Sequence, residues 1–313
     1  MRRTILAAAA LTLSLVLPGP AAGAKTGALA GASAPTQAKK QAATCAALPA
    51  GSGTPWKPGE RLAFDIDVMG AQAGSLSMMA LPPVGKGTSK EHVFRALAAS
   101  NSFFSKVRRV RGRSTAYVRD RDMRPRRYEE MTEEGGSFRS ADVVFKGPGD
   151  GKVAQLAWSL DQRKGTRNLR YLNDAFDPVS IAYYLRTLDL EAGQEICFDS
   201  YGIRRLWRVK GKVVGLEDVR VPAGNFKAWH LEGIATRTDS PGIKKEIHIW
   251  ISADEARLPV AALGVIDLGA VRAQLTHVGV GPDANEDRIV ADLVRPKASP
   301  PSPRPAPSKP RVR

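Results

Sequence analysis

Histidine and cysteine are common metal ligands, and this chain has only four histidines and two cysteines. The histidines are His92, His230, His248 and His277, and no two of them are spaced as H-x-x-x-H. The cysteines do not have the spacing of a zinc site. His230, His248 and His277 fall on separate predicted strands, so only the fold could bring them together. The sequence therefore predicts no metal ion and no other cofactor.

Evidence for catalysis is weaker still. The chain has no G-x-S-x-G nucleophile motif and no glycine-rich phosphate loop after a predicted strand. A hydrolase of the glycosidase type needs two facing carboxylates, and a β-sheet could supply them from Asp65, Asp67, Glu246 and Asp254. Acids on strands more often face solvent, so we predict no catalytic residue and keep a carboxylate hydrolase as a lesser alternative.

One segment, DPVSIAYYLRTLDLEAG at residues 177–193, has the pattern of a helix in a chain whose other patterns are typical of strands. Asp177 is a good N-cap, Pro178 suits the first turn and Gly193 indicates an end. Helical spacing gives one apolar face, formed by Ile181, Tyr184, Leu185 and Leu188. Arg186 and Asp189 point away from that face.

We expect this amphipathic helix to have a structural role and to close one end of a β-core. The alternative is that part of the segment lines the entrance of a cavity and binds a ligand. The residues that would do so are Tyr183, Tyr184 and Arg186.

Alternation of apolar and polar residues dominates the rest of the chain. In RLAFDIDVM, Leu62, Phe64 and Ile66 share one face, while Asp65 and Asp67 share the other, which is typical of a half-buried antiparallel strand. Comparable short segments recur, separated by Gly, Pro, Asp or Asn. We predict a mainly β fold with a large curved antiparallel sheet (a barrel, a half-barrel or a two-sheet sandwich) and one short amphipathic helix.

The two ends of the chain differ from its middle. Residues 1–24 have the charged start, apolar core and small-residue cleavage site of a signal peptide. Residues 25–44 are predicted to be a flexible leader, and residues 295–313, with seven prolines, a disordered basic tail. We expect a single β-rich domain over residues 45–294 that is exported to the periplasm or the exterior. It should be soluble after cleavage and have no transmembrane segment. In an exported protein the pair of cysteines, Cys45 and Cys197, most simply forms a disulfide, the alternative being two buried thiols.

The chain is strongly basic, with a formal net charge of +16. Much of this charge lies at the ends, and a second concentration runs from Lys106 to Arg127, with ten basic and two acidic residues. We predict that such a basic face contacts an anionic envelope component, either a lipid or a polymer, since export argues against nucleic acid. The residues predicted to make this contact are Arg108, Arg111, Arg113 and Arg208.

Four segments in order carry a resemblance to a known family. They are GERLAFDIDVMGAQAGSLSM at Gly59, DPVSIAYYLRTLDLEAGQ at Asp177, VPAGNFKAWHLEG at Val221 and IWISADEARLPVAA at Ile249. Together they resemble the bacterial envelope family known as domain of unknown function 3108, over about Lys57 to Val278. The resemblance implies export, a β-rich fold and no established activity, and it provides no catalytic residues.

These observations favour an exported envelope protein that is a non-enzymatic binding or carrier module for an amphiphile or an anionic envelope component. A curved sheet with an apolar concave face could hold an acyl chain. One alternative is a structural envelope protein whose basic ends contact anionic cell-surface polymer, and the other is the carboxylate hydrolase. An interior apolar cavity would distinguish the carrier from the structural protein.

Overall fold

A computed structural model of the chain describes residues 45–51, 53–147, 151–266, 269–283, 286 and 289. The predicted signal peptide, leader and basic tail lie outside the described residues, so they remain predictions. Among the described residues, no helix has the length and apolar content needed to cross a bilayer.

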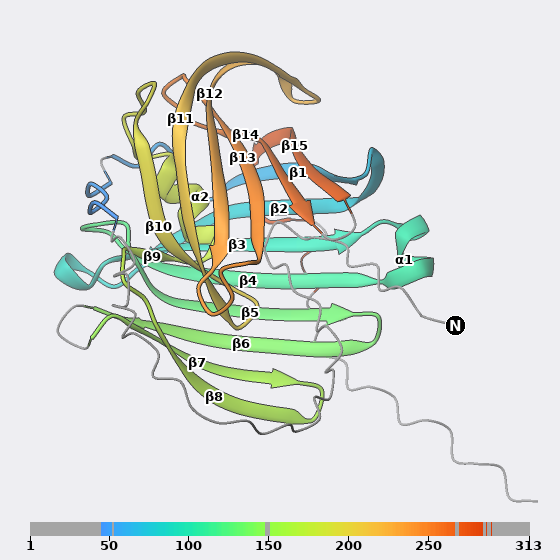
Figure 1. Cartoon of the computed structure of the whole chain (residues 1–313). Helices are drawn as coiled ribbons and strands as arrows, with labels where there is room; N and C mark the ends of the chain where they lie inside the picture. Colours follow the sequence, from blue (N-terminus) through green and yellow to red (C-terminus); the bar gives the residue numbers. More distant parts are fainter. Residues whose placement is uncertain are drawn as a thin grey trace, which may run out of the picture.

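The described residues form one sheet of fifteen strands (Figure 1). The strands are β1 (Glu60–Val68), β2 (Ala71–Val84), β3 (Glu91–Ser100), β4 (Val110–Arg119), β5 (Pro125–Glu134), β6 (Ser137–Lys146), β7 (Val153–Leu160), β8 (Arg163–Arg170), β9 (Ala175–Phe176), β10 (Glu195–Gly202), β11 (Arg205–Val221), β12 (Gly224–Arg237), β13 (Lys244–Ser252), β14 (Pro259–Ile266) and β15 (Gly269–Val280). Two α-helices, α1 (Ser102–Arg108) and α2 (Pro178–Leu185), and a 3-10 turn, η1 (Gly87–Ser89), complete the described elements.

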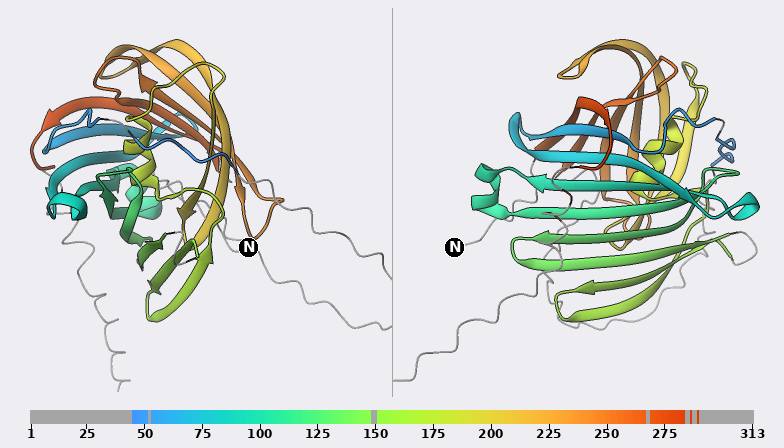
Figure 2. Two further views of the ribbon diagram at one scale, coloured as in Figure 1. Left: turned by 90° about the vertical axis from the view of Figure 1, so that its left-hand side faces the viewer. Right: turned by 180° about the vertical axis from the view of Figure 1, so that it is seen from behind.

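The sheet is antiparallel except where β9 pairs with β10, and it is not closed, because β8 and β9 form its two edges. Pairing of β1 with β15 joins the strands β1–β8 to the strands β15–β9. Figures 1 and 2 show β10–β14 running steeply across the direction of β3–β8, so that the sheet curls around α2. This confirms the predicted mainly β class with a large curved antiparallel sheet, and the open edges exclude a closed barrel.

The alternation seen in the sequence has its expected cause. On β1 the side chains of Leu62, Phe64, Ile66 and Val68 are buried, and the residues between them are half-buried. Successive side chains of a strand point to opposite faces, so only every second one reaches the concave core. The concave face therefore collects the apolar residues of most strands into one continuous core.

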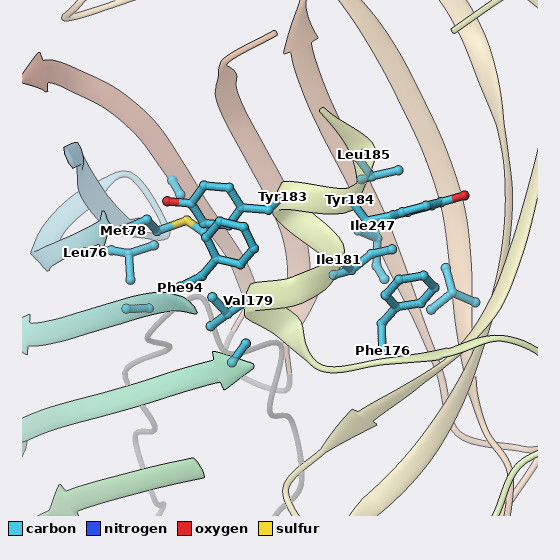
Figure 3. Close-up of a cluster of buried hydrophobic side chains, with 14 of the residues drawn as sticks. Leu76, Met78, Phe94, Phe176, Val179, Ile181, Tyr183, Tyr184, Leu185 and Ile247 are labelled. Atoms are coloured by element: carbon cyan, nitrogen blue, oxygen red, sulfur yellow. The ribbon is translucent and has the colours of Figure 1, made fainter. Parts of the chain in front are cut away.

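Helix α2 forms where the sequence predicts it but ends earlier. The Asp177 carboxylate accepts the backbone N–H groups of Val179 and Ser180, each at 2.9 Å, and so caps the first turn. Figure 3 shows the α2 side chains reaching in two directions, Tyr183 towards Phe94 and Tyr184 towards Phe176. Since α2 lies inside the curled sheet, all of its residues except Ala182 are buried.

The elements α1 and β8, and the short η1 and β9, were not predicted. The basic segment that starts at Lys106 begins inside α1, which is capped by Asn101, whose side chain accepts the Phe104 N–H at 2.9 Å. A helix of seven residues is too short to produce a clear periodicity. Strand β8 was missed because Leu169 is its one buried residue, as suits an edge strand, so its sequence shows no alternation.

The predicted disulfide is confirmed. Cys45 and Cys197 are bonded, with their Cα atoms 5.5 Å apart. The bond ties the segment that precedes β1 to β10. The Cys45 N–H also donates to the Asn173 side chain at 2.8 Å, and the Leu48 N–H donates to Asp174 at 2.9 Å. The start of the domain is therefore fixed by polar contacts as well as by the covalent link.

Candidate functional site

An apolar cavity of about 140 Å³ lies between α2 and the inward face of the sheet. Its polar lining residues are Ser200, Lys212 and Glu232. The apolar lining includes Phe64, Met78, Pro178, Ile181, Ala182, Leu185, Ile196, Phe198, Val209, Leu231, Ile247, Ile249, Ile251, Ala262, Val271 and Ala273. Such a site can hold an apolar group but offers little to bind a charge or a metal ion.

The cavity exists because small residues meet on neighbouring strands. One residue from each of β10–β15 forms a row of successive register partners, and three of the six are glycines. The row is Ile196, Gly211, Gly233, Ile247, Gly264 and Val271. Glycine is required at Gly211, where an added Cβ would lie 2.2 Å from the Glu232 carbonyl oxygen. All six residues of the row belong to the cavity lining, so its wall here is partly backbone.

Helix α2 presents a different set of residues to the cavity from the set predicted to bind a ligand. Pro178, Ile181, Ala182 and Leu185 belong to the lining, whereas the predicted ligand-contacting residues do not. Those residues, Tyr183, Tyr184 and Arg186, are all buried in packed surroundings. Tyr183 stacks on Phe94 with ring centroids 3.7 Å apart, and the Tyr184 hydroxyl donates to the Pro49 carbonyl at 2.7 Å. Their predicted role as a gate stays untested.

The burial of Arg186 was not predicted. Its side chain is 0% exposed, although helical projection places it opposite the apolar face. The guanidinium donates to both Glu60 carboxylate oxygens, at 2.6 and 3.1 Å, and to the Ala256 carbonyl at 3.0 Å. It also lies over the Trp56 ring, 5.6 Å from the centroid. The physical reason is that the curled sheet and the segment before β1 cover both sides of the helix.

Two buried carboxyls lie outside the predicted candidate acids: Glu130, which the sequence did not single out, and Asp177, which it identified only as a helix cap. Glu130 accepts hydrogen bonds from the hydroxyls of Tyr128 and Tyr201 at 3.3 and 3.4 Å, and burial raises its pKa. Asp177 caps α2 with Oδ1, while its buried Oδ2 has no hydrogen-bond partner. Burial raises the pKa of Asp177 to about 6. Neither residue belongs to the cavity lining.

Replacing Asp177 with asparagine should make stability less sensitive to pH. The folded-state pKa of about 6 exceeds the ordinary 3.8, so the folded protein binds more protons between these values and loses stability as the pH rises through them. About 2 pKa units at 1.36 kcal/mol each amount to roughly 3 kcal/mol. Asparagine is chosen because it also caps helices. We expect the difference in unfolding free energy, Asp177→Asn minus wild type, to rise by about 2–3 kcal/mol between about pH 4 and pH 7.

Urea unfolding followed at several pH values measures this difference. Asp254→Asn is the matched control, because the exposed Asp254 also accepts a backbone N–H, that of Arg257 at 3.2 Å. A difference between Asp177→Asn and wild type that is the same at every pH would contradict the prediction.

Two of the histidines do converge, but on the outer face of the sheet. His230 Nδ1 lies 2.7 Å from Glu217, His230 Nε2 lies 2.9 Å from His248 Nδ1, and His248 Nε2 lies 3.1 Å from Glu246. The two rings and the two carboxylates thus form one chain of hydrogen bonds, in which the donor and acceptor of each bond depend on the histidine tautomers. Trp250 stacks on His230 and donates its indole N–H to Glu217 at 2.9 Å, the main cause of a lowered Glu217 pKa.

This chain of hydrogen bonds is separated from the cavity. His230 and His248 alternate with Leu231, Ile247 and Ile249, which line the cavity, so they lie on the opposite face of β12 and β13. His92 lies on β3 and His277 on β15. Within the part of the chain that the structure describes, no group of three or more His, Cys, Asp or Glu side chains could hold a metal ion.

The candidate acids of a hydrolase occupy separate places. Asp65 and Asp67 lie on β1, where their strand partners on β15 are Gln274 and Arg272. Glu246 contacts His248, and Asp254 accepts a hydrogen bond from Ser252 at 2.7 Å. No pair of these acids shares the cavity lining.

The arginines predicted to contact an anion come from three elements, and that contact stays a prediction. Arg108 belongs to α1 and pairs with Glu134 at 3.0 Å, while Arg111 and Arg113 follow on β4. Arg208 lies on β11 and pairs with the buried Asp199 at 3.0 Å. Seven strands lie between β4 and β11 in the sheet order. Arg108, Arg111 and Arg113 thus lie close together in the sequence, and Arg208 has a separate structural partner.

Comparison with known proteins finds a family model, described as a protein of unknown function (DUF3108), that matches residues 63–276. No curated protein matches the chain. A solved β-barrel-like protein of domain of unknown function DUF1849 from Brucella abortus is similar, with 10% identity and a TM-score of 0.47, over 72% of this chain and 98% of that one. Two further solved structures each have 10% identity and a TM-score of 0.34, over 71% of this chain and 96% of theirs. One is described as an exported protein with a YmcC-like fold, from Bacteroides fragilis, and the other as a lipoprotein from Parabacteroides distasonis.

Proposed function

The chain belongs to the DUF3108 family, whose description gives no activity, and from the cavity we propose that it is a non-enzymatic binding module for an amphiphile. The observation that carries this proposal is the apolar space between α2 and the inward face of β10–β15. The described lining contains a single acid, Glu232, whereas a glycosidase-type hydrolase needs two carboxylates. An interior apolar cavity also has no evident use in a purely structural envelope protein.

The size of the cavity limits what it can take. Apolar cavities of about 150 Å³ stay dry and bind benzene, so a space of about 140 Å³ accepts a ring or a short alkyl segment. Each CH₂ group transferred from water into such a site contributes about 0.8 kcal/mol. A longer amphiphile would therefore place only the end of its apolar part here and keep its polar headgroup outside.

We propose that the protein is exported and performs this function in the bacterial envelope. The signal-peptide pattern of residues 1–24 supports it. The disulfide between Cys45 and Cys197 supports it independently, because structural disulfides persist mainly in oxidising compartments. Amphiphiles with acyl chains are abundant components of a bacterial envelope, so a carrier exported there would meet its ligand.

Filling the cavity should weaken ligand binding strongly. Ala262 lies in the lining, and its register partners Ile249 and Ala273 also line the cavity. Ala262→Leu adds three carbon atoms to this space, and three CH₂ equivalents at about 0.8 kcal/mol each correspond to a loss of affinity of at least about tenfold. Isothermal titration of the purified protein with decanoic acid measures the change.

The matched control is Ala270→Leu, the same substitution at an exposed position of the neighbouring strand β15. It should bind decanoic acid as wild type does, and both variants should melt within a few degrees of wild type. Equal affinity of Ala262→Leu and Ala270→Leu for decanoic acid would overturn the proposal, as would an absence of binding by wild type.

A further inference from the structure

Helix α1 presents apolar side chains to solvent. Phe103 and Val107, one turn apart on the helix, are 68% and 64% exposed. Phe104, which follows Phe103 in the chain, packs against the main core. A short helix on a soluble protein normally turns its apolar face inward, so α1 has an outward apolar face that its own fold does not use.

The orientation of α1 is fixed by specific contacts. The Asn101 side chain caps α1 through the Phe104 N–H, and its amide donates to the Gln72 carbonyl on β2. The Asn101 N–H donates to the Ala73 carbonyl at 2.9 Å. These bonds and the partly buried Phe104 hold the helix so that Phe103 and Val107 point outward. Their exposure is therefore a property of the fold.

A third exposed apolar side chain lies at the same end of the sheet. Met69, 74% exposed, is in the turn between β1 and β2, and α1 contacts the start of β2 through Asn101. Figures 1 and 2 show this turn and α1 at the same end of the strands in every view. The apolar surface thus comes from two adjacent connections.

The same region is basic. Between Ser102 and Arg113 the chain has five basic and no acidic residues. The acids that face them from β5 are Glu133, which pairs with Arg109 at 2.9 Å, and Glu134, which pairs with Arg108 at 3.0 Å. Even with both acids counted, the region keeps a net charge of +3, and one of its five basic residues, Lys106, lies on the exposed face of α1.

We infer that α1 and the β1–β2 turn form a docking surface for a membrane with anionic headgroups. A bilayer interface of this kind accepts inserted Phe and Val side chains and attracts nearby Lys and Arg. Neither an anionic polymer nor water offers the apolar layer that Phe103, Val107 and Met69 require. This surface and the cavity share no residue, so the inference does not depend on the proposed function.

Vesicle binding tests the inference. The mature chain is sedimented with vesicles of phosphatidylcholine alone and of phosphatidylcholine mixed with phosphatidylglycerol, at low and high salt. Wild type should bind the mixed vesicles, and high salt should weaken the binding. Phe103→Ser combined with Val107→Ser should bind at least about tenfold more weakly, since two inserted apolar side chains are lost. Lys106→Glu should also weaken binding to the mixed vesicles.

The matched control changes two exposed apolar residues elsewhere, Val214→Ser with Leu216→Ser on β11. It should bind as wild type does, and thermal melts should show that all variants are folded. A second measurement locates the contact with the membrane. In Phe103→Trp the introduced indole should fluoresce more strongly when vesicles bind, and brominated lipids in the vesicles should quench that fluorescence. The inference is overturned if the Phe103/Val107 variant binds like wild type or if the control pair loses as much. It is also overturned if wild type does not bind the mixed vesicles, for example because a protein partner is what binds this surface.

Discussion

Replacing Arg186 with alanine should lower the free energy of unfolding by about 3–5 kcal/mol. The Arg186 side chain is 0% exposed and that of Glu60 only 12%, so the change would leave a largely buried carboxylate without its counter-charge. It would also remove the donor to the Ala256 carbonyl at 3.0 Å. Removing one partner of a buried ion pair is more damaging than replacing both, because the remaining charge stays desolvated.

Urea unfolding of matched variants measures this loss. Arg257 is the control: it donates to the Leu188 carbonyl and to Asp189, both at 2.6 Å, but its side chain is 32% exposed and that of Asp189 is 79% exposed. Arg257→Ala should therefore lose no more than about 1 kcal/mol. The double variant Arg186→Met with Glu60→Leu should recover much of the loss. If Arg186→Ala is no less stable than Arg257→Ala, the buried pair does not stabilise α2 as we argue.

The unpredicted burial of Arg186 shows where reasoning from local patterns stops. The cap at Asp177 and the burial of Ile181 and Leu185 follow from helical spacing, and the structure has all of them. Helical projection assumes that one side of a helix faces solvent, whereas α2 is enclosed by the curled sheet. The partner of Arg186 is Glu60, 126 residues earlier, and no local pattern contains that contact.

The sheet could be predicted from local patterns only in part. Alternation identified strands such as β1, because their two faces have different surroundings. The pairing of β1 with β15 joins segments about 200 residues apart, for example Glu60 with Val280, and periodicity carries no information on it. Edge strand β8 was missed because both of its faces are mostly exposed.

An apolar concave face was expected, but the position and lining of the cavity could not have been predicted. Gly211, Gly233 and Gly264 are unremarkable in the sequence, and each could have marked a turn. Only the register places them in one cross-strand row, with Ile247 between the last two. The closest signal was the apolar face of residues 177–193, of which Ile181 and Leu185 line the cavity.

Removal of the disulfide should be the other strongly destabilising change. Cys45 and Cys197 are separated by 152 residues, and the bond restricts a very long loop in the unfolded chain. The chain-entropy description gives about 4.7 kcal/mol for a loop of roughly 100 residues, and removal of native disulfides typically costs about 2–5 kcal/mol. We expect Cys45→Ala with Cys197→Ala to lose an amount in that range. Urea unfolding of this variant, and of wild type with and without a reductant, gives two independent estimates.

The variant should nevertheless reach the same folded state. The segment after Cys45 is held by other contacts: the Leu48 N–H donates to Asp174 at 2.9 Å, and the Leu48 carbonyl accepts from Arg124 at 2.8 Å. The Pro49 carbonyl accepts a hydrogen bond from the hydroxyl of Tyr184, an α2 residue that does not line the cavity. Decanoic acid should therefore bind the double alanine variant almost as tightly as wild type, despite its lower stability. A large loss of affinity at a temperature where the variant is fully folded would mean that the disulfide shapes the cavity itself. A loss of stability below about 1 kcal/mol would mean that the unfolded chain is already compact around this pair.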